Sequence, residues 1–485
     1  MRQKAKIIIF VLSFTLVFLH GAPALAAGSI DDTYTYDFWG MAVKSVPAFE
    51  LTRTINEKSL DVTVQGFNDV CAGKDRVFLI DTVESRLEVL DADFNLITSV
   101  KLIRNADKKI VTDPDTGNQL ILTNPEGVWY HEPMDEIYIA DTGASRIIVL
   151  DGTGYYLKRM IERPDNMIGS TQFNPSKIVV DQANKIYFVV QSGFEGIVEL
   201  NESGSFSRYF GVNKPVVNFW DYFWKTLSSD TQKSKMAKTY APSFNNIDVD
   251  DQGFIYATTI DSAAQEMVFR LNPKGENVLR QEGSLTVTGD LPFNMNSGPS
   301  AFTDIAINDY GVYALLDQSK GRIFLYDFDG NLINIFASSG DLKGDFRAPS
   351  AIAWFGDKLI ATDKTLRCAY VYEMTDFGKA ALGAAKHYYA GEWEEAARLA
   401  EEAIRLNANY DVAYVNLGKY YLMKDDFKAA MHYFNLGNDR KFYSQAYNGY
   451  RNIWVRDHFI WILLVFLLAA GALIYSEFRY HRRKG

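Results

Sequence analysis

Residues 125–151 read PEGVWYHEPMDEIYIADTGASRIIVLD. A short apolar strand is followed by a second strand that ends in Asp141, a polar turn, and a third strand that ends in Asp151. The second and third strands consist almost entirely of apolar residues, many of them β-branched, as expected of strands that are covered on both faces. This segment is therefore predicted to be one unit of a layered β structure.

The same pattern occurs six times between Phe67 and Tyr372, so the chain is a repeat protein. The spacing of 47 to 69 residues fits a propeller blade of about 40 to 50 residues that carries insertions in some copies. The copies align on their first strands at Val70, Val128, Ile178, Ile247, Ile305 and Ile352. We predict a mainly β fold, a six-bladed β-propeller, whose radial packing protects the strand edges.

One copy carries a recognisable family signature. Residues 175–181 read PSKIVVD, and other copies continue with Ile-Tyr-x-x-Asp and then Arg-Ile-x-x-Leu/Tyr-Asp. Over roughly two thirds of the chain this pattern resembles the NHL repeat. The resemblance implies the fold but little about function, since propellers of this kind serve as binding platforms, lyases and lactonases alike.

The ring needs a strand from elsewhere to close. No fourth strand follows Tyr372 before the sequence becomes helical, whereas 43–55 is strand-like and has no blade of its own. We expect this N-terminal strand to complete the last blade, so that the propeller occupies 27–375 and contains an insertion at 211–243.

The N-terminus has the pattern of a secretory signal. Basic residues at Arg2, Lys4 and Lys6 precede an apolar run over 7–19 and the Ala-Leu-Ala sequence of 24–26. We predict a signal peptide over 1–26, with an uncleaved anchor as the alternative.

The C-terminus has the pattern of a membrane anchor. A transmembrane helix is predicted over 453–476, followed by a basic tail over 477–485. Because positive charge stays in the cytoplasm, we expect a single-pass cell-membrane protein with an extracytoplasmic (extracellular) propeller. Without the signal and the tail, residues 27–476 carry a net charge of about −16, which argues against nucleic acid as a partner.

Helical periodicity begins after Asp376. Gly391, Trp393 and Ala396 recur 34 residues later, which is the tetratricopeptide (TPR) period. The segment 376–450 therefore resembles two TPR units, fewer than the three usually needed to stand alone. We expect it to pack on the propeller as a spacer or partner-docking element, with a peptide-binding groove as the alternative.

The two cysteines, Cys71 and Cys368, are too few for a disulfide scaffold. They lie in the first and sixth blades, which become neighbours when the ring closes. We expect two buried thiols, and a bridge between these blades is the alternative.

Candidate binding residues fall into two groups. Long insertions lie between blades, on one face of the ring, and the longest contains Trp220, Phe223 and Trp224. These aromatic residues are either a lid or partner patch, or a helical pair packed on the ring. The starts of the first strands supply a second set near the channel: Asp69, Glu126, Lys177, Asn246 and Asp304.

Oxygen ligands that converge on one axis suit a hard cation, so calcium is one candidate cofactor. More often such groups cap strands and hydrate a channel. Transition-metal catalysis is disfavoured because the propeller contains one histidine, His131, and no nucleophile elbow or phosphate loop is recognisable. We expect no catalytic residues.

The sequence favours a binding role. We expect a membrane-anchored scaffold that recognises a protein, or a small-molecule or carbohydrate ligand, and docks a membrane or envelope partner, for example in a transport complex. The alternative is a metal-dependent lactonase or esterase, because residues 126–129 faintly resemble the metal-binding start of gluconolactonase-like propellers.

Overall fold

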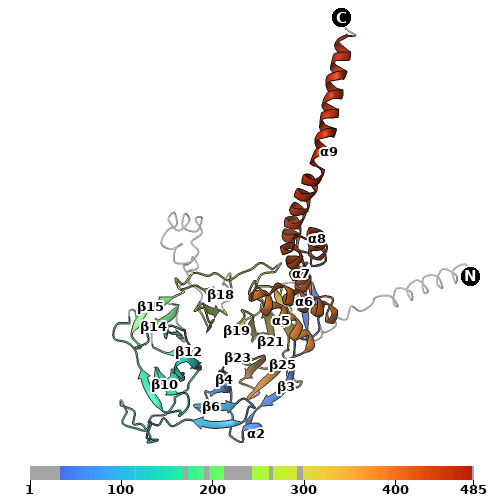
Figure 1. Cartoon of the computed structure of the whole chain (residues 1–485). Helices are drawn as coiled ribbons and strands as arrows, with labels where there is room; N and C mark the ends of the chain where they lie inside the picture. The colour runs from blue at the N-terminus through green and yellow to red at the C-terminus, as the bar shows by residue number, and fades with distance from the viewer. Residues whose placement is uncertain are drawn as a thin grey trace, which may run out of the picture.

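The computed structural model describes residues 33–482 except 115, 168–172, 191–195, 212–242, 261–265, 284 and 292–298. These residues form a six-bladed β-propeller followed by helices, as predicted (Figure 1). The signal segment 1–26, the aromatic residues Trp220, Phe223 and Trp224, and residues 483–485 lie outside the described part.

The first four blades follow one another along the chain. Blade 1 consists of β4 (Phe67–Ala72), β5 (Arg76–Asp81), β6 (Arg86–Asp91) and β7 (Leu96–Val100). Blade 2 consists of β8 (Gly127–His131), β9 (Glu136–Asp141), β10 (Arg146–Asp151) and β11 (Leu157–Ile161). Blade 3 consists of β12 (Pro175–Val180), β13 (Ile186–Val190), β14 (Ile197–Leu200) and β15 (Phe206–Phe210). Blade 4 has β16 (Asn246–Val249), β17 (Ile255–Thr258) and β18 (Val268–Leu271) among the described residues.

The last two blades both incorporate N-terminal strands. Blade 6 contains β23 (Pro349–Phe355), β24 (Lys358–Asp363) and β25 (Cys368–Met374), and β3 (Phe49–Ile55) pairs antiparallel with β25. Blade 5 contains β19 (Phe302–Ile307), β20 (Tyr313–Asp317), β21 (Arg322–Tyr326) and β22 (Leu332–Phe336), extended by β1 (Tyr34–Tyr36) and β2 (Ala42–Lys44). The predicted closure of the ring is thus confirmed.

The predicted bounds of the closing strand, 43–55, are wrong at the N-terminal end. Residues 42–44 belong to blade 5, and the chain then crosses to blade 6 through Pro47, which has no N–H to donate to a sheet. The crossing is held by Asn334, whose amide donates to Ser45 Oγ (3.1 Å) and accepts from the Ala48 N–H (3.0 Å). One N-terminal segment therefore joins two neighbouring blades.

The two faces of the ring carry different loops. Because strands alternate in direction, the turns after the first and third strands of each blade lie on one face, which we call the turn face. The connections between blades lie on the opposite, connection face. The helical region leaves from the end of β25, the third strand of its blade, and so begins on the turn face.

Four helices form two antiparallel hairpins against blades 5 and 6, with a further contact to blade 4. They are α5 (Asp376–Tyr389), α6 (Trp393–Leu406), α7 (Asp411–Met423) and α8 (Phe427–Leu436). Tyr389 accepts a hydrogen bond from Gln252 Nε2 (2.9 Å), and Lys419 pairs with Asp329 (3.4 Å) in a blade 5 turn. Gly378 is needed at one contact, since a Cβ there would lie 2.0 Å from the Ala48 carbonyl oxygen. The hairpins pack on the propeller, as expected.

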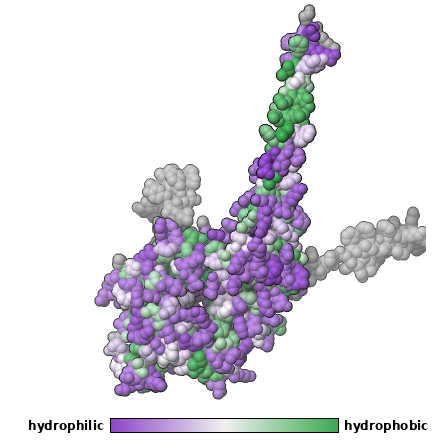
Figure 2. Space-filling view, in the orientation of Figure 1, coloured by the Kyte–Doolittle hydropathy of each residue, from purple (hydrophilic) through white to green (hydrophobic). Residues whose placement is uncertain are grey.

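The chain ends in one long helix, α9 (Arg440–Arg482). It is long and apolar enough to be a candidate membrane-spanning helix, and its apolar part forms the hydrophobic band that projects from the hydrophilic ring (Figure 2). The predicted boundaries at 453 and 476 do not interrupt it. Both cysteines are free and buried, which confirms the expectation of two thiols.

Replacing Phe49 tests whether the closing strand stabilises the ring. Its buried ring stacks on Phe336 (centroids 5.6 Å apart) and meets Trp354 edge to face (5.9 Å). Phe49→Ala should lower the free energy of unfolding by about 3–5 kcal/mol, because it leaves a cavity where the closing strand packs between blades 5 and 6. Urea unfolding of the detergent-solubilised protein measures this. Trp39→Ala, at a side chain that is 68% exposed, should change it by less than about 0.5 kcal/mol, and similar losses in both variants would contradict the closure.

Candidate functional site: the central funnel

A cavity of about 810 Å³ occupies the centre of the ring and opens on the turn face. We call it the central funnel. It is lined by residues 69–74, 128–133, 177–182, 246–251, 304–310, 352–354, 356 and 357, and by residues 386, 389 and 390 at the end of α5. Each blade contributes its innermost strand and the turn that follows. This is the face opposite to the blade connections where the sequence suggested recognition.

The floor of the funnel is built from four of the predicted channel residues. Asp69, Lys177, Asn246 and Asp304 occupy the same position in four first strands, one residue before the aligned apolar residue. Lys177 Nζ forms an ion pair with Asp69 Oδ1. The fifth, Glu126, does not line the funnel, and its backbone oxygen accepts a hydrogen bond from Asn68 Nδ2 (2.8 Å).

These polar side chains hold neighbouring blades together. The innermost strand of a blade is an edge strand, so its backbone groups toward the next blade need partners. Asp69 accepts from the Val128 N–H (2.8 Å), Asp248 from Ile307 (2.8 Å), and Asp304 from Ile352 (2.6 Å). Cys71 Sγ accepts from the Tyr130 N–H (3.3 Å) in the same way. Each acceptor belongs to one blade and each donor to the next.

Burial sets the charge state of this floor. It raises the pKa of Asp304 well above its ordinary value, and it raises that of Asp69 although Lys177 opposes the change. Burial also raises the pKa of Asp248 to about 7. The Lys177 ammonium group is paired with Asp69, one of the carboxylates that a bound cation would need as a ligand. Calcium at this position would therefore have to displace the Lys177 ammonium group. Among the described residues, no group of three His, Cys, Asp or Glu side chains is placed to hold a metal ion.

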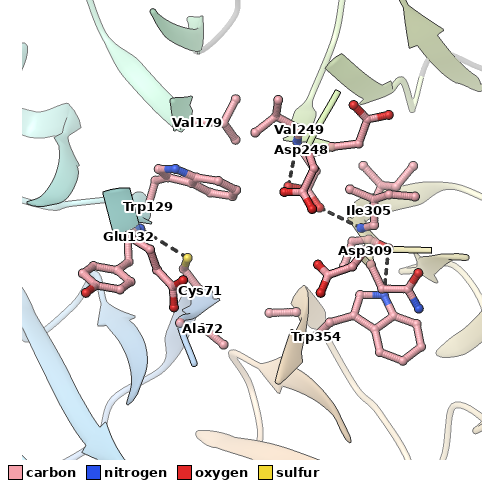
Figure 3. Close-up of a pocket in the computed structure, with 18 of the residues that line it drawn as sticks. Cys71, Ala72, Trp129, Glu132, Val179, Asp248, Val249, Ile305, Asp309 and Trp354 are labelled. Atoms are coloured by element: carbon pink, nitrogen blue, oxygen red, sulfur yellow. Dashed lines mark hydrogen bonds between the residues drawn. The ribbon is translucent and has the colours of Figure 1, made fainter. Parts of the chain in front are cut away.

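The wall above the floor is apolar. Figure 3 shows the ring of Trp129 extending toward the middle of the cavity, with Val179, Val249 and Ile305 along the wall, whereas the ring of Trp354 is turned outward, where it packs on Phe49. Trp354 Nε1 donates to the Ala306 carbonyl oxygen (3.1 Å), which fixes its ring. Trp129 Nε1 is buried and has no hydrogen-bond partner within the described part of the chain.

The mouth of the funnel is acidic. Glu132, Asp251, Asp309 and Asp357 lie in the turns after the first strands, and Lys74 pairs with Glu132 (3.1 Å). Burial and then the charges of Asp309, Asp250 and Glu132 raise the pKa of Asp251, so these carboxylates converge. The helix α5 overhangs one side with Lys386 and Tyr389.

The sequence did not single out the wall or the mouth. Trp129, Trp354, Asp251 and Asp309 become neighbours only when the ring closes. One signal was available, because Glu132, Asp251 and Asp309 occupy the same position of the repeat, four residues after the aligned apolar residue. The predicted patch of Trp220, Phe223 and Trp224 lies outside the described residues.

Comparison with known structures finds propellers. A streptogramin B lyase aligns over 68% of this chain and 100% of its own, at 13% identity and a TM-score of 0.42. The β-propeller domain of Myceliophteria thermophila Cps50 (Swd1) aligns over 67% and 100%, at 11% identity and a TM-score of 0.38. Hydrazine synthase of Kuenenia stuttgartiensis aligns over 64% and 96%, at 11% identity and a TM-score of 0.39. Likeness at this level concerns the fold and carries no functional argument.

No protein-family model and no curated protein matches the chain. The geometry of the funnel and of the helices is therefore what bears on function.

Replacing Lys177 tests whether its ion pair with Asp69 stabilises the floor of the funnel. Lys177→Met should lower the free energy of unfolding by about 3–5 kcal/mol at pH 8, because it leaves the Asp69 carboxylate buried without its partner. The pKa of Asp69 is raised in the folded protein, so the loss should shrink as pH falls and the carboxyl becomes neutral. Urea unfolding at pH 8 and pH 5 measures both effects.

Two variants complete this test. Adding Asp69→Asn should recover part of the stability at pH 8, since the amide oxygen still accepts from Val128 and no charge is buried. Lys343→Met, at an exposed lysine, should be neutral at both pH values. A loss from Lys177→Met that is the same at pH 5 and pH 8 would show that packing, and not the ion pair, explains it.

Proposed function

We propose that this chain is a membrane-anchored, extracytoplasmic binding protein whose propeller recognises a ligand or a partner protein. The central observation is how the channel side chains are used. The buried carboxylates of the floor accept hydrogen bonds that hold adjacent blades together, whereas the funnel above them stays open. Such a cavity has the volume of a ligand site, about 300–1,000 Å³ in proteins generally.

The helical hairpins support a docking role. They lie between the ring and α9, and they contact both: Lys419 of α7 pairs with Asp329 of the ring, and Phe427 of α8 packs against Gly449 of α9. Within this proposal the blades are NHL-like, the hairpins are TPR-like, and a signal peptide exports the ring. Docking of a membrane or envelope partner, as in a transport complex, follows from this position.

Hydrolysis of a lactone or ester is the alternative function. The carboxylate proposed for it on sequence grounds, Glu126, lies outside the funnel lining. Asp304 is buried and already accepts the N–H groups of Ile305 (2.7 Å) and Ile352 (2.6 Å). These contacts favour binding over catalysis.

Cysteine labelling tests the topology. The two native thiols are buried, so an introduced cysteine should be the reactive one. Ser203→Cys, in an exposed turn of blade 3, should react with a membrane-impermeant maleimide in intact cells, and Gly485→Cys only after permeabilisation. The reverse order of labelling would place the ring in the cytoplasm.

Site-specific photocrosslinking tests which face binds. Benzoylphenylalanine at Gln182, an exposed residue of the funnel mouth, should form adducts in native membranes. The same group at Leu342, an exposed residue in the connection between blades 5 and 6, should form few. Stronger adducts at Leu342 would move recognition to the connection face.

A lactone and ester panel on the purified protein gives the enzymatic comparison. If the protein hydrolyses a substrate and Glu126→Gln abolishes that activity, the binding proposal is wrong.

A further inference from the structure

We infer that the central funnel binds an organic ammonium ion carried on an apolar body. This inference rests on the proposed function of the funnel as a binding site and names the chemistry of its ligand. Two features of the funnel point to it: an excess of negative charge at the mouth, and an apolar wall with the indole ring of Trp129 below.

The lining of the funnel is strongly acidic. It contains nine carboxylates and three lysines. Lys177 is paired with Asp69 in the floor, and Lys74 is paired with Glu132 in the mouth (3.1 Å). The third, Lys386, lies over the ring of Tyr310 (5.6 Å to the centroid). Two of the three lysines are thus already paired within the lining. Burial raises the pKa of Asp248 and Asp304, and Asp250 pairs with Arg270 (3.0 Å), so the negative charge of the lining comes mainly from the mouth.

This excess is concentrated at the mouth. Asp251, Asp309 and Asp357 lie in the corresponding turns of three successive blades and are exposed. None of the three forms a hydrogen bond or ion pair with another described residue. Beyond burial, the charges of Asp309, Asp250 and Glu132 raise the pKa of Asp251 against the smaller effect of Lys74, so these carboxylates repel one another at the opening. A cation that enters the funnel relieves this repulsion.

The wall suits the body of such a ligand. Valine and isoleucine side chains from blades 3 to 5 provide apolar surface, and the ring of Trp129 extends into the cavity (Figure 3). The face of an indole ring attracts cations. An ammonium group and an apolar body therefore find their complements in the same cavity.

Other ligand classes fit less well. An anion is repelled by the mouth. A neutral sugar stacks on indole rings and hydrogen-bonds to carboxylates, but it does not neutralise the excess charge. Carbohydrate is therefore the competing ligand, and binding that ignores ligand charge is the outcome that would favour it.

Probes that differ only in charge provide the test. Binding of phenethylamine, 2-phenylethanol and phenylacetate to the full-length protein in detergent is measured by isothermal titration calorimetry. We expect the amine to bind about tenfold more tightly than the alcohol, the acid to bind least, and the preference to weaken at high salt. A blocked tetrapeptide that contains lysine, compared with its norleucine counterpart, shows whether a peptide side chain can supply the ammonium group.

Matched charge variants locate the effect. Asp251→Asn, Asp309→Asn and Asp357→Asn together should weaken binding of the amine about tenfold and leave that of the alcohol unchanged. The control combines Asp107→Asn, Glu162→Gln and Glu202→Gln, which remove three exposed carboxylates outside the funnel and should leave both unchanged.

The outcomes distinguish the inference about ligand charge from the proposed binding function. If the alcohol binds as tightly as the amine, or if both triple variants act alike, the charge inference is wrong and the funnel remains a binding site. If no probe binds, the funnel is not a small-ligand site and the proposed function loses its main support.

Discussion

A propeller ring is stable only when its first and last blades are joined. Here that joint is the pairing of β3 with β25, with the buried ring of Phe49 between aromatic residues of two blades. The same N-terminal segment extends blade 5 through β1 and β2, and Asn407 at the end of α6 donates to Ser45 (2.9 Å). Ring closure, blade 5 and the helical hairpins therefore meet at Ser45 and its neighbours, and the shape of the funnel depends on this joint.

The innermost strands explain why the channel contains so many polar residues. Each of these strands is an edge, and its free N–H groups need acceptors that do not come from its own sheet. Asp69, Asp248 and Asp304 supply them from the preceding blade. Carboxylates that look like a metal or catalytic site in the sequence are thus part of the ring's own bonding. The groups left for a ligand are higher up, at the wall and the mouth.

The sequence could predict the blades because each repeat carries its own strand pattern and turns. It could also predict the floor, because Asp69, Lys177, Asn246 and Asp304 share one repeat position. It could not show that Asp69 and Lys177, which are 108 residues apart, form an ion pair, since that depends on the radius and register of the closed ring. Nor could it show that β2 and β3 are separate strands. The chain crosses between two blades at Pro47, and this crossing is held by a hydrogen bond from the Ala48 N–H to Asn334, which is distant in the sequence. Local patterns set the elements, and long-range contacts set the site.

The absence of a loop between the hairpins and the apolar part of α9 has a mechanical consequence. Lys428 of α8 still lies over the ring of Tyr450 (5.6 Å), and the apolar run begins at Phe459. At 1.5 Å per residue, the intervening eight residues span roughly 12 Å, and they remain helical throughout. A stiff connection of this length does not let the ring swivel. The tilt of one helix in the bilayer would then fix the direction in which the funnel opens, and a partner that turned that helix would re-aim the mouth.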